Sequence, residues 1–355
     1  MATPREVSLL LKTMGEVDSQ ISTRKPIVGI TVGDPAGIGP EIVIKALADR
    51  STAETCRPVL IGDRKNLEWT NDRLELGATF KEYSVPSDPD GGMIEVMDQA
   101  NLVEAIEVGV ESRCAGRSAA KNIETAVELW RKGTIDAIST APISKNALKL
   151  AGYKFPGHTE FLASLTDTKE FAMSFFADRL RVVLLSTHVS LRNALELVTT
   201  QALVELIRFS DRTLPDFIGR RPRIAVAGVN PHASELGMFG DEESQEIEPA
   251  VEICRGEGID VSGPFSPDTI FLRGYRGEFD LVVACYHDQA TIAVKSLSFG
   301  ASVNVTLGLP LVRTSVDHGT AFDIAGKGVA DESSMKTAIR LAAELVKLRK
   351  LRNNQ

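Results

Sequence analysis

Apolar runs that match buried strands alternate with helical patterns along most of this chain, and this alternation constrains the fold more than any other feature. The runs that match strands lie at residues 27–32, 58–63, 137–142, 182–188 and 224–229. Apolar residues at helical spacing lie between them, at residues 41–47, 102–110 and 119–130. Strands that alternate with helices over such a length form a mainly parallel sheet, so we predict an α/β fold.

Two domains are the natural expectation for a chain of 355 residues, because single hydrophobic cores stop growing at roughly 250–300 residues. The first 25 residues combine charged side chains with one short apolar patch and no cleavage pattern behind it. We therefore interpret residues 1–25 as an N-terminal extension and not as a signal peptide. No apolar run approaches the roughly 18 residues of a membrane helix, so we expect no membrane partner.

The composition predicts a globular, cytoplasmic protein. Hydrophobic residues make up 43% of the chain and charged residues 25%. The four cysteines are far apart and form no CxxC pair, which is typical of a reduced compartment. A net charge of −8 without a basic stripe argues against a nucleic-acid partner. A small anionic ligand stays compatible with this charge, because a few local cations can outweigh the mean field.

A glycine-rich turn at residues 33–40 separates the first predicted strand from the first predicted helix. Pro40 at the helix start and the glycines before it are what a strand-to-helix junction needs. The glycine spacing matches neither the GxGxxG fingerprint nor a P-loop. Such a turn can receive an anion at the helix N-terminus or can be a tight turn without a ligand, and the sequence favours neither.

Five histidines lie beside strand ends or turns, at His158, His188, His232, His287 and His318. A single histidine is more often structural or exposed than functional. Three of them, His188, His232 and His287, follow apolar strands, and parallel strands can bring such imidazoles to one point. Neutral imidazoles suit Zn²⁺ or another divalent ion, while the long spacings exclude a zinc finger. We therefore expect a metal site with positions left open for substrate.

Residues 280–327 carry a second cluster of polar groups. Strand patterns at residues 281–284 and 302–306 are followed or accompanied by Lys295, Asn304 and Arg313. In open α/β sheets ligands bind beyond the carboxyl ends of the strands, so we place the active site here. Arginine and lysine near a histidine-bound metal suit a phosphorylated or carboxylated substrate. The alternative for Lys295 is a solvated surface group.

The catalytic base is left open by the residues alone. The candidates for catalysis are Lys145, Asp268, Asp288 and Lys295, since each lies near a predicted strand end or in the polar cluster. Thr159 is a candidate helix cap, with His158 at the mouth of the same helix.

Seven ordered motifs resemble those of the 4-hydroxythreonine-4-phosphate dehydrogenases of pyridoxal phosphate biosynthesis. They are GDPAGIGPE, PGHTEF, STHVSL, NPHASE, GPFSPDT, YHDQ and NVTLGLPLVRTSVDHGTAFDIAGKG, between about residues 27 and 330. The first and last motifs are also similar to those of isocitrate and isopropylmalate dehydrogenases. The resemblance implies a two-domain α/β/α subunit of that wider group, with a cleft between the domains. It places a cofactor-binding domain at residues 26–140 plus 290–355 and a metal- and dimer-forming domain at residues 141–289.

The resemblance also implies roles for particular residues. The metal ligands are His188, His232 and His287, with His188 and His232 joining His287 from the neighbouring subunit of a homodimer that shares its active sites. The residues that bind substrate are His158, Thr159, Lys295, Asn304 and Arg313. The residues that bind the cofactor, which is NAD or else NADP, are Leu307, Gly308, Asp317, His318, Gly319, Thr320, Ala321, Asp323, Ile324 and Ala325.

The implied reaction is the NAD-dependent oxidation of 4-phosphooxy-L-threonine at C3 with decarboxylation to 3-amino-2-oxopropyl phosphate. The divalent metal is Zn²⁺ or else Mg²⁺, Co²⁺ or Mn²⁺. After NPHA, however, the chain has Ser234 and Leu236 where these enzymes read closer to GEGGHMG. The alternative is therefore a 4-phospho-D-threonate or 4-phospho-D-erythronate 3-dehydrogenase that forms dihydroxyacetone phosphate. Further alternatives are a cis-dihydrodiol dehydrogenase, a phosphate acyltransferase and a non-catalytic binding protein.

Overall fold

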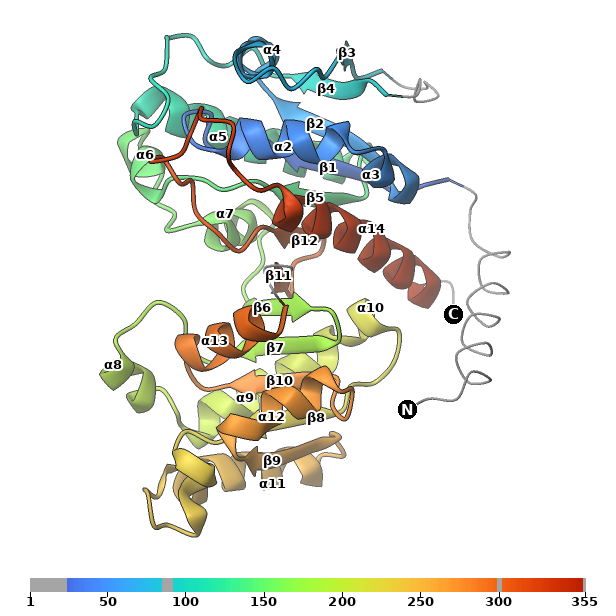
Figure 1. Ribbon diagram of the computed structural model, residues 1–355. Coiled ribbons are helices and arrows are strands. Elements are labelled where there is room, and N and C mark those ends of the chain that lie inside the picture. Colours follow the sequence, from blue (N-terminus) through green and yellow to red (C-terminus); the bar gives the residue numbers. More distant parts are fainter. Residues whose placement is uncertain (1–23, 85–91, 299–301, 354–355) are drawn as a thin grey trace.

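The computed structural model describes residues 24–84, 92–298 and 302–353, and a single twelve-stranded sheet runs through it (Figure 1). Most of the predicted N-terminal extension, residues 1–23, lies outside these ranges. The strand order is β3-β4-β2-β1-β5-β12-β11-β6-β7-β10-β8-β9. Neighbouring strands are parallel except for three antiparallel pairs, β12–β11, β11–β6 and β6–β7. The predicted α/β class is therefore confirmed.

The strands are β1 Ile27–Thr31, β2 Arg57–Gly62, β3 Phe80–Glu82, β4 Ile94–Asp98, β5 Ala137–Thr140, β6 Ala172–Ala177, β7 Leu180–Leu184, β8 Ile224–Ala227, β9 Val261–Phe265, β10 Leu281–Ala284, β11 Val303–Leu307 and β12 Val312–Ser315. The helices are α2 Gly39–Ala48, α3 Arg50–Thr55, α4 Arg64–Arg73, α5 Arg113–Arg131, α6 Lys145–Leu150, α7 His158–Leu165, α8 Leu191–Glu196, α9 Thr200–Thr213, α10 Pro215–Ile218, α11 Glu248–Gly256, α12 Pro267–Tyr275, α13 His287–Ser298 and α14 Ser333–Asn353. A short 3₁₀ helix, η1 Pro231–Glu235, and a short π-helix, η2 Glu243–Ile247, complete the described elements.

Helices cover both faces of the part of the sheet that runs from β3 to β12. Alternate residues of β1 point to opposite faces, as the two-residue period of a strand requires. Val28 and Ile30 belong to one buried cluster with Ile42 of α2. Ile27 belongs to a second buried cluster with Ile123 of α5. Burial on both faces explains why this strand has no polar alternation in its sequence.

The part of the sheet from β6 to β9 has the same three layers. Val182 and Val282 share a buried cluster with residues of α12 and α13, and Val183 and Val283 belong to another with residues of α9 and α11. These valines pair across β7 and β10, which are parallel neighbours. The carboxyl ends of β7 and β10 therefore meet at the same edge of the sheet, which places the residues after them close together.

Strand β11 joins the two parts of the sheet. Asn304 of β11 pairs with Ser315 of β12 on one side and with Phe175 of β6 on the other. The sheet is therefore continuous through this strand. The division into residues 26–140 plus 290–355 and residues 141–289 stays a proposal; α6 and α7, which follow residue 141, contact α5.

The helix expected at residues 102–110 is wrong, because this segment has no helical turns. Val103 is 77% exposed, so the helical spacing of apolar residues does not mark a buried face here. The backbone N–H of Leu102 instead donates to the carboxylate of Asp63 at 3.1 Å. The same carboxylate caps α4 by accepting from the N–H of Asn66 at 3.0 Å. A side-chain contact distant in sequence thus holds the start of this irregular segment.

Two further expectations concern features of the whole chain. Within the described ranges, no helix is both long enough and apolar enough to cross a membrane. All four cysteines carry free thiols, and Cys56, Cys254 and Cys285 are buried. The absence of cysteine pairing, inferred from the spacing, is confirmed.

Candidate active site

A cleft of about 350 Å³ lies where the β11–β12 pair meets the ends of β5 and β7 and the starts of α7 and α13. Residues from both parts of the sheet line it. The predicted site residues among them are Lys145, His158, Thr159, His188, His287, Asn304, Arg313, Asp317, His318 and Gly319. These residues are spread over much of the chain, and the sheet brings them to one place.

Arg313 projects from β12 into this cleft and is only 2% exposed. Its guanidinium donates to Thr140 Oγ1 at 2.9 Å, Thr306 Oγ1 at 3.1 Å and Asn304 Oδ1 at 3.3 Å. Burial lowers the pKa of Arg313 to about 9. Its Nε has no hydrogen-bond partner among the described residues, and all its partners are neutral. A buried cation held only by neutral groups is unfavourable by itself, so the geometry suits an anionic ligand.

His158 and Thr159 open α7 close to this arginine. Burial, with the charge of Arg313 as the second cause, holds the pKa of His158 well below its ordinary value, so the imidazole is neutral. Its Nε2 is buried and has no partner in the described part of the chain. Thr159 is not the predicted cap: Gly157 occupies the cap position because His158 is already helical. The Thr159 hydroxyl lies 3.5 Å from Thr306 Oγ1, at the wall of the cleft.

His188 and His287 converge at the other end of the cleft. Their ring centroids are 5.6 Å apart with a tilt of 41°. The carboxylate of Asp288 lies 2.7 Å from Nδ1 of His287, an arrangement that leaves Nε2 available for a ligand. Burial, followed by the charges of Lys145 and His287, lowers the pKa of His188. Two imidazoles of one chain are therefore arranged as a metal would require.

His232 does not join them within one chain. It is exposed in the η1 turn, and its ring lies 6.5 Å from that of Phe239. No group of three histidine, cysteine or acidic side chains suited to a metal forms within the described ranges. The expectation that His188 would come from the neighbouring subunit to meet His287 is corrected, since β7 and β10 are adjacent strands of the same chain.

The candidates for the catalytic base are separated by the fold. Lys145, the first residue of α6, lines the cleft. Asp288 contacts His287, is exposed, and lines a neighbouring cavity with His188 and His287. Asp268 lies in the first turn of α12 and accepts from Ser266 Oγ, away from the residues that line the cleft. Lys295 is exposed in the last turn of α13 and likewise does not line it.

The predicted cofactor segment from Asp317 onward folds over the glycine-rich turn that follows β1. The backbone N–H of Ile38 donates to the carbonyl oxygen of Thr320 at 3.0 Å. A Cβ atom on Gly37 would lie 2.9 Å from that oxygen, so the close approach requires glycine at this position. Asp317, at the start of the segment, accepts hydrogen bonds from Ser302 and Ser334. The glycine-rich turn thus has a tertiary partner in this segment.

Leu307 and Gly308, also predicted to bind the cofactor, lie at the other end of β11. Leu307 is fully buried. Gly308 lines a separate cavity together with Leu309 and Pro310, and a Cβ atom added to it would lie 2.9 Å from the ring of Phe209. Strand β11 runs away from the cleft after Asn304, and the antiparallel strand β12 returns to it. Leu307 and Gly308 lie at the turn between the two strands, away from the cleft. The structure therefore separates these two residues from the segment that begins at Asp317.

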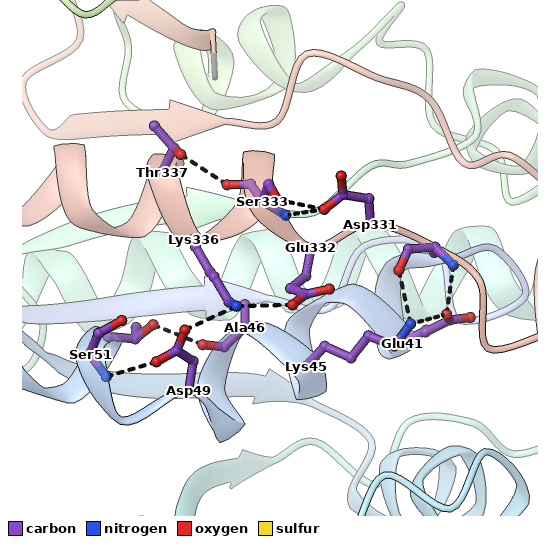
Figure 2. Close-up of polar contacts among 12 residues, drawn as sticks. Glu41, Lys45, Ala46, Asp49, Ser51, Asp331, Glu332, Ser333, Lys336 and Thr337 are labelled. Carbon is purple, nitrogen blue, oxygen red and sulfur yellow. Dashed lines mark hydrogen bonds and ion pairs between the residues drawn. The ribbon is translucent and has the colours of Figure 1, made fainter. Parts of the chain in front are cut away.

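Charged side chains of α2 hold the far end of the cofactor segment in place. Figure 2 shows Lys45 beside Glu41, with Nζ donating to Glu41 Oε1 at 2.7 Å. Nζ also donates to the carbonyl oxygens of Gly328 and Ala330, each at 2.9 Å. The N–H of Ala330 in turn donates to Glu41 Oε1 at 2.8 Å. One buried ion pair therefore fixes the chain just before α14.

Several residues that line the cleft escaped the sequence reasoning. Glu160 directly follows Thr159, and Ser315 lies two residues after Arg313 on the same face of β12, so the sequence carried a signal for both. Met173 and Phe175 line the cleft because β6 pairs with β11, and no local pattern announces that pairing.

Comparisons with known proteins agree with this geometry. The family model described as "Pyridoxal phosphate biosynthetic protein PdxA" matches residues 54–342. A D-threonate 4-phosphate dehydrogenase of Cupriavidus necator is 47% identical over 323 residues, which cover 90% of this chain and 97% of that protein. A 4-hydroxythreonine-4-phosphate dehydrogenase of Desulforapulum autotrophicum is 44% identical over 330 residues, which cover 91% and 96%.

A solved structure extends the similarity to the fold. The crystal structure of 4-hydroxythreonine-4-phosphate dehydrogenase from Klebsiella pneumoniae matches with a TM-score of 0.83 and 41% sequence identity, covering 92% of this chain and 100% of that chain. All three relatives are named as dehydrogenases, but their names give two different substrates.

Proposed function

We propose a substrate and a reaction for this chain from the premise that it belongs to the PdxA family and is therefore an NAD(P)-dependent dehydrogenase. The proposed reaction removes hydride from C3 of a 4-phosphorylated 3-hydroxy acid, with NAD as the acceptor. The hydroxyl proton leaves at the same time. The resulting 3-keto acid then loses CO₂ from C1, and C2 takes up a proton from water to give a phosphorylated ketone.

D-threonate 4-phosphate is the substrate that we propose. Two relatives that bear this activity in their names are 47% and 45% identical to the chain. The departures at Ser234 and Leu236 from the vitamin-pathway pattern agree with it. The second candidate is 4-phosphooxy-L-threonine, which a relative of 44% identity and the family description favour. The two acids differ at C2, where the first carries a hydroxyl and the second an amine.

The observation that carries the proposal is the buried Arg313 with neutral partners alone. Its free Nε and the unpartnered Nε2 of His158 point to a ligand that accepts hydrogen bonds. A phosphate or a carboxylate accepts several at once and supplies the missing negative charge. Asn304 and Thr159 stand beside this position and would orient the substrate so that C3 faces the imidazole pair. Lys145 is our candidate for moving the C3 hydroxyl proton, since it is the one member of the four predicted catalytic candidates that lines the cleft.

His188 and His287 of one chain fit a divalent ion, since their rings converge and Asp288 orients one of them. We assign the third nitrogen to His232 of the partner subunit in a homodimer. When bound, Zn²⁺ or a similar ion acidifies a hydroxyl and stabilises negative charge on oxygen. Apolar side chains beside these positions favour a partner: Leu236 is fully exposed, and Leu191 is 60% exposed.

A substrate panel tests the proposal. NADH absorbance is followed with D-threonate 4-phosphate, 4-phosphooxy-L-threonine and D-erythronate 4-phosphate, each with and without a chelator. We expect the highest kcat/KM with D-threonate 4-phosphate and loss of activity after metal removal, restored by Zn²⁺. A clearly higher kcat/KM with 4-phosphooxy-L-threonine would show that this acid, our second candidate, is the substrate. No NADH from any of these acids, with metal bound, would overturn the proposed reaction.

A further inference from the structure

A carboxylate stands inside the cleft among groups suited to anions. Glu160 is the third residue of α7 and lines the same cleft as Arg313 and Lys145. Its Oε2 lies 3.4 Å from the position that a Cβ atom on Gly157 would occupy, so the side chain turns back toward the start of the helix. Among the described residues, no group donates a hydrogen bond to this carboxylate. Asp317, the other acid that lines the cleft, is engaged by Ser302 and Ser334.

Glu160 lines the cleft together with Arg313, His188 and Thr159, its neighbour in α7. Burial lowers the pKa of Arg313, and the charge of Glu160 opposes this shift. The carboxylate therefore borders the space that a bound substrate would fill.

The chemistry of the proposed substrates limits what Glu160 can contact, so this step rests on the proposed function. Each acid has two anionic groups, the carboxylate at C1 and the phosphate at C4, and a second carboxylate repels both. Each has two hydrogen-bond donors, the hydroxyl at C3 and the hydroxyl or ammonium at C2. The C3 hydroxyl is the reacting group and belongs at the imidazole pair. The C2 substituent is the donor that remains.

We infer that Glu160 accepts a hydrogen bond from the C2 substituent and makes this enzyme select acids that carry a donor there. Hydrogen bonds to an ionised group are stronger than those between neutral groups. A substrate without a donor at C2 would cover the carboxylate and leave it unpaired, which is unfavourable. Sites built around such a polar group discriminate strongly against an analogue that lacks its partner.

A purely structural role is the competing explanation. A glutamate at the third helical position can reach back to the start of its helix and cap it, and glutamine serves there equally well. If capping were the role, Glu160→Gln would behave like wild type with every substrate. Glu160→Ala would then lower stability and weaken all substrates alike.

The test pairs two substrates with three proteins. The acid preferred in the panel and its 2-deoxy analogue, 3-hydroxy-4-phosphobutyrate, are compared in wild type, Glu160→Gln and Glu160→Ala. For the acid with a C2 substituent, we expect kcat/KM to fall about 10-fold in Glu160→Gln and about 100-fold in Glu160→Ala. For the 2-deoxy analogue, which has no partner for the carboxylate, we expect kcat/KM to stay the same or rise in both variants. Glu205→Gln, which changes an exposed carboxylate outside the cleft, is the matched control and should leave both values unchanged.

Calorimetric binding of both acids supplies a readout that does not require turnover. Equal losses on the two acids, or no loss on either, would overturn the role of Glu160 while the proposed function stands. A wild-type protein that neither binds nor oxidises the substituted acid would overturn both together.

Discussion

Single residues in and near the cleft have buried polar atoms without hydrogen-bond partners among the described residues. Arg313 is buried with neutral partners, and the Nε2 of His158 has no partner among the described residues. Asp34, in the glycine-rich turn, is fully buried, and its Oδ2 has no hydrogen-bond partner in the described ranges. Such groups lower stability and persist where a ligand or a proton compensates them. These residues are therefore suited to binding a ligand and do not add to the stability of the fold.

Replacing Arg313 separates these two effects. Arg313→Met keeps much of the volume but removes the buried charge, so we expect kcat/KM for the phosphorylated substrate to fall by at least about 100-fold. The free energy of unfolding should stay unchanged or rise by about 1–2 kcal/mol, because an unpaired buried cation is removed. Assays with NADH absorbance and urea unfolding measure both. Arg349→Met, which changes an arginine paired with Asp216 outside the cleft, should leave KM unchanged. A marked loss of stability in Arg313→Met would contradict this account.

Asp34 predicts a pH dependence of stability. Burial, with the charge of Glu111 adding to it, raises the pKa of Asp34 to about 6, while its hydrogen bond from the N–H of Ala36 opposes the shift. The folded protein then binds more protons than the unfolded chain between about pH 4 and 6, so the contribution of Asp34 to stability falls as the pH rises through this window. Asp34→Asn cannot ionise and escapes this loss.

We expect the free energy of unfolding of Asp34→Asn, relative to wild type, to increase by about 2–3 kcal/mol from pH 4 to pH 8. Urea unfolding at several pH values gives this difference, in which other titrating groups cancel. A difference that does not change with pH would show that Asp34 stays ionised, or neutral, throughout.

At the scale of elements, α14 ties the cofactor segment to α2 and α3. Lys336 of α14 lies 3.0 Å from Asp49, which caps α3, and 2.9 Å from Glu332, the residue just before α14 (Figure 2). Lys45 and Glu41 hold the backbone just before α14. The ion pairs of Lys336 are partly exposed, whereas the carboxylate partner of Lys45, Glu41, is 1% exposed. The two ion pairs should therefore differ in their contribution to stability.

Comparing Lys45→Met with Lys336→Met tests this difference. Lys45→Met leaves the buried Glu41 without its cation, so we expect a loss of about 3–5 kcal/mol in the free energy of unfolding. The end of the cofactor segment is released as well, so KM for NAD should rise more than KM for the acid substrate. Lys336→Met removes a partly exposed contact and should have a smaller effect on both. If both variants lost the same free energy of unfolding, burial of Glu41 would not explain the stability of this junction.

The whole molecule, as proposed, is incomplete as a single chain. His232 lies in a turn where five successive residues, from His232 to Leu236, have positive φ, a conformation that is unfavourable outside glycine. Glu243 fixes the start of this turn by accepting from the N–H groups of Val229 and Asn230. The turn therefore presents His232 outward on a rigid base, as a site shared between two subunits would need.

Subunit mixing tests this arrangement. In a heterodimer of His232→Ala with His287→Ala, one site keeps all three histidines and the other loses two, so mixing two inactive proteins should restore about one quarter of wild-type activity. Mixing His188→Ala with His287→Ala should restore none, because these two histidines come from the same chain. Recovery in the second mixture, or none in the first, would contradict the proposed distribution of ligands.

The sequence by itself determined the α/β class, most strands and a large part of the cleft. Strand ends could be recognised from apolar runs, and the carboxyl ends of parallel strands share an edge, so His188 and His287 were predicted to converge. Arg313 and Asn304 followed from the same rule and from the family motifs. These features depend on local patterns that the chain carries wherever it folds.

Only the tertiary structure decided which neighbours in sequence become neighbours in space. Antiparallel pairing of β11 carried Leu307 and Gly308 to the far end of that strand, although they lie close in sequence to the cofactor segment. Pairing of β6 with β11 brought Met173 and Phe175 into the cleft, and the left-handed turn after β8 turned His232 away from it. Strand pairing and turn handedness depend on contacts between distant segments, and local periodicity carries no information about them.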